Sequence, residues 1–324
     1  MENPISLFKK RARLAKPKGL RSPLYYVRRT VIGLEADKGL LFKLFIYVIL
    51  IDTAFIYLSP ILYMISNMMK GTADLLDPSV VWVPRTLYLG HLQDAWESLK
   101  YVKSFTISLS LTTSVALLQT VSCAVAGYAF ARLQFPLKKF WFFCLLLSFV
   151  IPIQATVLPS LLAAVSMGWI NTYIPILLPA VFGHGLKGAL FVIIFRQFFM
   201  TQPKELEEAA KMDGANVFRT FYRVMLPLAK PASIVVFLFA FVWTWNDYYL
   251  PGMYLMSSDN TPLSMGLSQI SEVLTVRQAE EGPSIFDESI KMATSFLVIL
   301  PPLILYAFTQ RWFVEGVERT GLVE

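Results

Sequence analysis

The sequence predicts an all-α membrane protein with six transmembrane helices and both termini in the cytoplasm. Its 324 residues are 56% hydrophobic and only 16% charged, with a mean hydropathy of +0.56, whereas soluble domains are about 45–50% apolar. Crossing the hydrocarbon core takes roughly 20 apolar residues. Stretches close to that length recur at residues 41–69, 105–131, 140–165, 173–195, 232–251 and 290–308.

The first span is preceded by a basic tail. Residues 1–38 hold ten of the 29 Lys and Arg but three of the 22 Asp and Glu, and beyond residue 38 the charges balance. A basic stretch before an apolar span holds that stretch in the cytoplasm, so the net charge of +7 indicates topology rather than nucleic-acid binding. The chain therefore divides into a basic cytoplasmic tail, 1–38, and a transmembrane domain, 39–324.

Because the basic region is too long for a cleavable signal peptide, we expect the first span to remain in the protein. Apolar residues recur at helical spacing after Pro23 and favour a short basic helix on the membrane surface. They are Leu24, Val27, Val31 and Leu34. A partly disordered arm that only sets topology is an equal alternative.

The loops carry charge that agrees with this topology. Counting from a cytoplasmic tail places 70–104, 166–172 and 252–289 outside, and 132–139, 196–231 and 309–324 inside. The inner loop 132–139 is purely basic, whereas 252–289 has six acidic residues against Arg277 alone, as the positive-inside rule requires. Cys123 and Cys144 fall inside apolar runs, where we expect free thiols.

The inner segment 201–227 predicts two short helices joined by a turn. Thr201 is expected to cap the first helix, and Glu205, Glu207 and Glu208 favour its N-terminal end. Gly214 can end this helix in a left-handed conformation, and Pro227 is expected to stop the second. Exposed apolar residues would suit a groove on a partner protein, and an ordinary amphipathic hairpin is an equal alternative. The apolar residues are Leu206, Met212, Val217, Phe221 and Val224.

This segment resembles the coupling motif of permease subunits in binding-protein-dependent ABC importers. The resemblance lies in Glu208-Ala209-Ala210, Asp213-Gly214-Ala215 and Leu226-Pro227. It implies a type I ABC importer permease fold, in which residues 201–227, the coupling loop, form a cytoplasmic coupling helix that enters a cleft of a separate ATPase. The residues implied to contact the ATPase are Glu205, Glu208, Ala209, Ala210, Asp213, Gly214, Ala215, Leu226 and Pro227.

Nearly the whole chain after residue 40 is similar to the carbohydrate branch of that family, including the maltose-type second permease. The similar stretches include Ile151-Pro152-Ile153-Gln154, Asn171-Thr172-Tyr173, the run from Trp245 to Pro251, and Gln310-Arg311-Trp312-Phe313-Val314. The departures are the basic tail, Asp247 where many relatives carry Glu, and the ending from Val317 to Glu324.

The resemblance also implies the partners. It implies a heterodimer with a second, homologous permease, an ABC ATPase dimer that holds ATP and Mg²⁺, a periplasmic or extracellular solute-binding protein, and a carbohydrate substrate. The chain itself would be non-catalytic, bind no cofactor or metal, and cross the bacterial inner (plasma) membrane several times. The role of the tail is not implied.

Two groups of polar residues in the spans could contact substrate. His184 and Lys187 are costly inside apolar sequence unless they meet water or an anion, and the glycines around them favour a broken helix lining a cavity. These two residues suggest an acidic saccharide, as in alginate-type oligosaccharide importers; pairing of the lysine with a carboxylate of the partner permease is an equal alternative. Gln154, Asn246 and Asp247 are the other candidates, and for the last two a structural role at the membrane interface is favoured.

Other functions fit the sequence less well. It has two histidines, no Cys/His metal spacing and no phosphate loop. A membrane-embedded enzyme on lipid-linked sugar would use Asp247, Glu272 or Asp287, but it leaves the coupling motif unexplained. An ion-coupled secondary transporter is expected to carry repeated halves, which the sequence does not show.

Overall fold

The computed structural model describes residues 39–185, 187–256, 260–282 and 284–321. The basic tail and its predicted surface helix lie outside these residues. Within them the chain is helical, and the β-structure found there is one isolated bridge between Lys70 and Leu87. The chain divides into two units, Met1–Tyr63 and Met64–Glu324.

The helix α3 (Leu40–Met68) contributes to both units, since the division falls near its end. It is 29 residues long and apolar enough to cross a membrane. In the second unit, α4 (Thr72–Leu76) and α5 (Gly90–Ser98) lie in the segment 70–104, which was predicted to be an outer loop.

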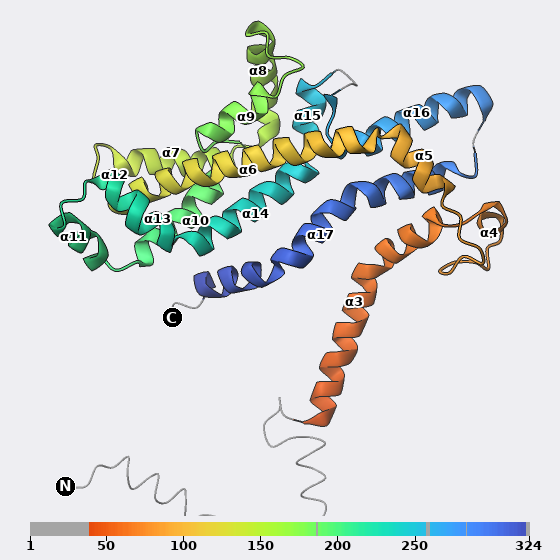
Figure 1. Cartoon of the computed structure of the whole chain (residues 1–324), viewed down its shortest axis with the longest axis horizontal. Coiled ribbons are helices and arrows are strands. Elements are labelled where there is room, and N and C mark those ends of the chain that lie inside the picture. The colour runs from red at the N-terminus through yellow and green to blue at the C-terminus, as the bar shows by residue number, and fades with distance from the viewer. Residues whose placement is uncertain (1–38, 186, 257–259, 283, 322–324) are drawn as a thin grey trace, which may run out of the picture. The chain divides into compact units, whose positions relative to one another are not determined.

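The core of the second unit is built around the 32-residue helix α6 (Tyr101–Arg132). It packs against α9 (Ile174–Val181), α10 (Gly188–Thr201) and α14 (Lys230–Asn246), and α14 in turn contacts α17 (Asp287–Gly321) (Figure 1). Large side chains such as Phe191, Phe195 and Trp245 are fully buried between these helices. Burial of aromatic surface supplies most of the packing energy in such a core.

Gly127 of α6 allows α10 to approach closely. A Cβ at this position would lie 2.5 Å from the Cβ of Phe195 and 2.9 Å from the backbone nitrogen of Arg196. Small residues permit this kind of close helix contact in membranes, where packing rather than hydrophobicity drives association.

Three of the six predicted spans are single helices in the described residues, and the others are divided or bent. Among the described residues, α3, α6 and residues 287–311 of α17 are each long and apolar enough to cross alone. The count reaches five if each of two bent helix pairs is one span. These pairs are α7 (Lys138–Val150) with α8 (Ile153–Ser166), bent by 97°, and residues 217–228 with α14, bent by 77°.

Local backbone chemistry explains the breaks. The predicted third span divides at Ile151 and Pro152, both extended, because a proline disfavours helix at the residue before it and has no N–H to bond the preceding turn. The predicted fourth span divides into α9 and α10. The predicted fifth span ends at Asn246, followed by the short α15 (Tyr249–Tyr254).

The remaining elements lie between α15 and α17. A 3₁₀ turn, Leu263–Met265, leads into α16 (Gly266–Glu281), whose last turns meet the start of α17. The carboxylate of Asp287 is buried and accepts hydrogen bonds from Gln278 Nε2, at 2.7 Å, and from Arg277. These bonds hold the two helices together.

Candidate functional site

The coupling loop forms a short helix, a turn and a second, irregular helix. The first is α11 (Glu205–Met212); the second runs through α12 (Val217–Thr220), the π-helix η1 (Phe221–Met225) and α13 (Leu226–Leu228). The predicted cap of the first helix is wrong. Thr201 is the last residue of α10, and its hydroxyl donates to the Phe198 carbonyl at 2.8 Å. Pro227 is the next-to-last residue of the second helix, which ends at Leu228, so the stop falls where it was predicted to within one residue.

The turn at Gly214 is as predicted. Gly214 has φ of +75°, and its N–H donates to the Lys211 carbonyl at 3.0 Å while the Ala215 N–H donates to the Ala210 carbonyl at 2.9 Å. These two bonds form a Schellman motif. Asn216 then caps α12, because its Oδ1 accepts from the Arg219 N–H at 2.8 Å.

The two faces of α11 differ. The side chains of Glu205, Glu208, Ala209 and Met212 are exposed, whereas Ala210 is buried and Glu207 half-buried. Glu207 lies 3.4 Å from Arg132 of α6. Of the predicted ATPase contacts, Asp213 and Gly214 are also exposed and Ala215 is half-buried, so all of this set except Ala210 has accessible surface on the loop.

The apolar residues of the coupling loop also separate into two sets. Phe221 and Val224 pack against the core, while Met212 is 88% exposed and Phe218 83% exposed. Phe218 was not among the apolar residues predicted to suit a partner's groove. It lies in α12 beside the exposed Val217, and its exposure depends on how the loop packs, which helical spacing alone does not show.

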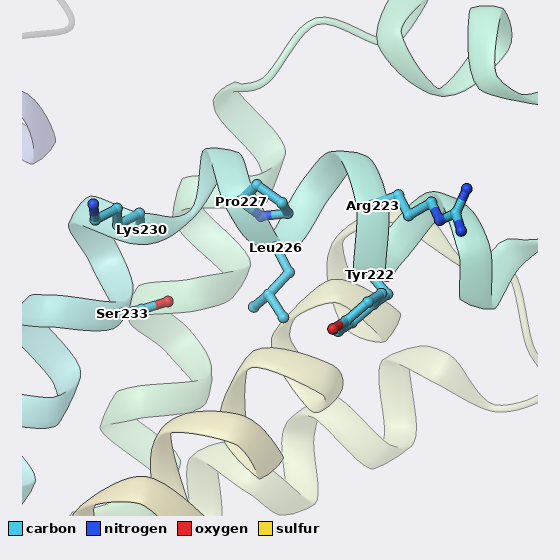
Figure 2. A pocket seen from close by; sticks show the side chains of 6 residues that line it. All are labelled: Tyr222, Arg223, Leu226, Pro227, Lys230 and Ser233. Atoms are coloured by element: carbon cyan, nitrogen blue, oxygen red, sulfur yellow. The ribbon is translucent and has the colours of Figure 1, made fainter.

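The closing pair Leu226 and Pro227 lines a shallow groove of about 550 Å³ at the junction of α13 and α14. Figure 2 shows Leu226 and Tyr222 extending to the same side of the chain, with Arg223 and Lys230 toward opposite ends. Ser233 completes the lining. Both charged residues of the groove are basic.

The break between α9 and α10 is held by α6. Gly183 and Gly185 have positive φ, and so does Lys187, at +59°. Three side chains of α6 donate to carbonyls of this segment. They are Gln119 Nε2 to His184 at 3.2 Å, Ser122 Oγ to Val181 at 2.6 Å, and Cys123 Sγ to Gly183 at 3.6 Å.

Non-helical backbone at membrane depth persists only where protein or water satisfies it, and α6 does this here. The sequence contains a signal for these contacts. Gln119, Ser122 and Cys123 are spaced i, i+3 and i+4, and this spacing places three hydrogen-bonding side chains on one face of an apolar helix. The gap between α9 and α10 confirms the predicted break in this span, and the cavity that the break was expected to line stays a prediction.

His184 and Lys187 lie on this break with exposed side chains, and Lys187 Nζ is 6.0 Å from the centre of the Phe149 ring. The other candidates lie elsewhere: Gln154 is exposed in the first turn of α8, and Asn246 is exposed at the end of α14. No hydrogen bond or ion pair joins any two of the five candidates in the described part of the chain.

Asp247 has a structural task. Its Oδ1 accepts from the backbone N–H of Tyr249 at 3.0 Å and of Leu250 at 3.3 Å, so the carboxylate caps α15. This geometry favours the structural interpretation of Asp247. Both cysteines are free thiols, as predicted, and the described residues contain no cluster of three His, Cys, Asp or Glu side chains suited to a metal ion.

Comparison with known proteins gives a consistent result. Residues 124–319 match the family described as binding-protein-dependent transport system inner membrane component. The chain is 30% identical over 244 residues to the sn-glycerol-3-phosphate transport system permease protein UgpE of Pectobacterium atrosepticum, covering 72% of this chain and 81% of the relative. It is 28% identical over 282 residues to the osmoprotective compounds uptake permease protein GgtD of Synechocystis sp., covering 85% and 90%.

A solved structure shares the fold. It is a chain of a bacterial ABC transporter involved in the import of the acidic polysaccharide alginate, which matches with a TM-score of 0.71 at 22% identity over 86% of this chain and 98% of that chain.

Proposed function

Because this chain belongs to the family of binding-protein-dependent transport system inner membrane components, we propose that it is one of two permease subunits of an ATP-driven carbohydrate importer, coupled through α11 to a separate ATPase. The observation that carries the coupling role is α11 itself. It is a short helix with an exposed acidic and apolar face, including Glu208 and Met212, and the turn at Gly214 fixes its end. This is the shape and chemistry that a groove on a partner can bind.

In this proposal the chain crosses the membrane six times with both termini in the cytoplasm, and the broken pairs α7–α8 and α9–α10 contribute to the crossings. A loaded solute-binding protein docks on the outer loops. ATP and Mg²⁺ bind to the ATPase dimer, whose closure moves the coupling helices of both permeases and opens the path outward. Hydrolysis then restores the inward-open state. The permease itself is non-catalytic.

A carbohydrate substrate is supported by the solved importer of the acidic polysaccharide alginate; the names of the two relatives concern glycerol phosphate and osmoprotective compounds, which are small polar solutes. The exposed His184 and Lys187 beside the helix break add a reason to propose an acidic sugar. The membrane-enzyme and secondary-transporter alternatives find no support in these relatives.

Purification of the tagged full chain from its own membranes tests the proposal. A second permease and an ATPase are expected in the detergent extract, and Glu208→Lys is expected to lose the ATPase while keeping the second permease. The matched control is Asp94→Lys, which reverses an exposed acid on α5, far along the chain from the coupling loop. A solitary protein, or equal ATPase recovery in both variants, would contradict the proposed coupling.

A further inference from the structure

One ion pair ties the coupling helix to α6, the helix around which the core is built. Arg132 is the last residue of α6, and its Nε lies 3.4 Å from Glu207 Oε1 of α11. The side chains are 7% and 12% exposed, respectively. The same guanidinium donates to the carbonyl of Gln202, in the chain that enters α11. One side chain therefore holds both α11 and its entry segment.

Other contacts also hold α11. Gln202, before the helix, is extended, and Gly214, after it, is in the left-handed region, where the two bonds of the Schellman motif fix the turn. The helix packs against α12 and η1 of the same loop, and Ala210 is the one residue of α11 that is buried. The low exposure of Arg132 and Glu207 strengthens the attraction between their charges, although Nε and Oε1, 3.4 Å apart, form no hydrogen bond. This pair and the bond from Arg132 to Gln202 therefore link α11 and its entry segment to α6.

The helix α6 leads from this pair to the helix break. Cys123 and Arg132 are nine residues apart, which corresponds to about 14 Å along an α-helix. Gln119, Ser122 and Cys123 hold the carbonyls between α9 and α10, where His184 and Lys187 lie. A displacement of α11 passed to Arg132 would reach the break through one continuous helix.

Resting on the proposed coupling role of α11, we infer that the Arg132–Glu207 ion pair transmits movement of the coupling helix to α6, which makes both residues positioning residues for transport. Neither residue belongs to the coupling motif that the sequence shows. Glu208, next along the chain, is exposed, whereas Glu207 faces Arg132 of the protein's own core.

The test uses the whole transporter, purified with its ATPase, second permease and binding protein and placed in proteoliposomes. Arg132→Met and Glu207→Gln are expected to keep the ATPase bound but to lower solute uptake per ATP hydrolysed about tenfold. The double variant Arg132→Glu with Glu207→Arg restores the pair with reversed charges but not the bond to the Gln202 carbonyl, because a carboxylate cannot donate, and it is expected to recover part of the coupling that either single variant loses. Lys139→Met, an exposed cation of the same inner loop, is the matched control and should couple normally.

The outcomes separate this inference from the proposed function. Absence of an ATPase from the wild-type preparation would overturn both. An ATPase bound to every variant, with unchanged uptake per ATP in both single variants, would overturn the transmission role alone. A merely structural role would lower thermal stability or complex yield in the single variants without changing uptake per ATP, and this result would also overturn it.

Discussion

Replacement of Gly214 by valine tests how much the coupling loop depends on one backbone conformation. Gly214 has φ of +75°, and a Cβ added there would meet nothing within 4 Å. Crowding is therefore absent, and the cost is the intrinsic one of the left-handed region, about 1–2 kcal/mol for a residue with a Cβ. Since 1.4 kcal/mol is a factor of ten, the native turn should become about 5–30 times less favoured.

The expected result is loss of coupling in a protein that still inserts and folds. The turn orients α11 through the bonds of Gly214 to Lys211 and of Ala215 to Ala210, and both weaken when the turn opens. Uptake per ATP should fall about tenfold, while the melting temperature in detergent changes little because the core contacts of α6 are untouched. Limited proteolysis should cut within residues 201–227 faster than in the wild type.

Two other glycines provide matched controls. Gly168 has φ of +69° and Gly282 has φ of +88°, and a Cβ at either position also meets nothing within 4 Å. Valine at either position strains a positive-φ backbone outside the coupling loop, and at Gly282, whose ψ is 169°, the strain is at least as large as at Gly214, so coupling should persist in both. Gly214→Asn should recover much of the function, because asparagine tolerates this conformation. Normal coupling in Gly214→Val, or an equal loss in Gly168→Val, would refute the reasoning.

Three further changes test the fold around the site. Gly127→Ala places a Cβ 2.5 Å from the Cβ of Phe195 and should destabilise the fold by about 1–3 kcal/mol through overpacking. The measurement is the melting temperature, which should fall. The control is Gly71→Ala, where the added Cβ has its nearest neighbour at 3.8 Å, and this variant should melt as the wild type does. Asp247→Ala should destabilise the protein by about 0.5–2 kcal/mol through loss of the α15 cap, and Asp247→Asn should not; equal loss of uptake in both variants, without a stability change, would instead indicate substrate contact. Gln119→Leu leaves the His184 carbonyl without this donor, at a cost of about 1–3 kcal/mol. It should speed alkylation of the buried Cys123 in a Cys144→Ala background, and an unchanged rate would contradict the role of Gln119 at the break.

The sequence predicted the long helices well because the hydropathy of a span is summed over about 20 residues, so no single residue decides the prediction. The spans 41–69, 105–131 and 290–308 correspond to α3, α6 and α17, which stay single helices although Pro60 lies inside α3 and Pro301 and Pro302 lie inside α17. The third and fourth spans are as apolar, but hydropathy does not register a bend. At these breaks, proline and glycine change the backbone direction without changing the polarity of the segment.

Residues of the candidate site were predicted correctly where their role depends on their own backbone conformation rather than on a contact with a distant part of the chain. Gly214 acts through its own φ, so residue type and position suffice. The Arg132–Glu207 pair joins residues from separate helices, and nothing in the neighbourhood of either residue indicates the other. Glu207 was interpreted only as a favourable charge at the start of a helix; its inward direction depends on how α11 packs, which is a tertiary property.

Lys187 presents the remaining energetic problem. An ammonium at the centre of a membrane helix costs about 2.5–3.5 kcal/mol on insertion scales. Its Nζ lies 6.0 Å from the ring of Phe149, and a cation–π contact contributes about 0.5–1 kcal/mol at an exposed site. Phe149 does not offset that cost alone; in the proposed importer, a water-filled path or a carboxylate of the second permease would supply the rest.

Lys187→Met separates these two possibilities because they predict opposite changes. If the lysine faces a water-filled path, methionine should keep the two permeases together and selectively reduce uptake of an acidic oligouronate relative to a neutral oligosaccharide, with Lys187→Arg as the charge-preserving control. If it pairs with a partner carboxylate, methionine strands that charge, which costs about 3–5 kcal/mol for a buried pair, and the second permease should be lost on purification. An intact complex that transports both sugars as the wild type does would exclude both roles, because the charge at position 187 would then do nothing that either role requires.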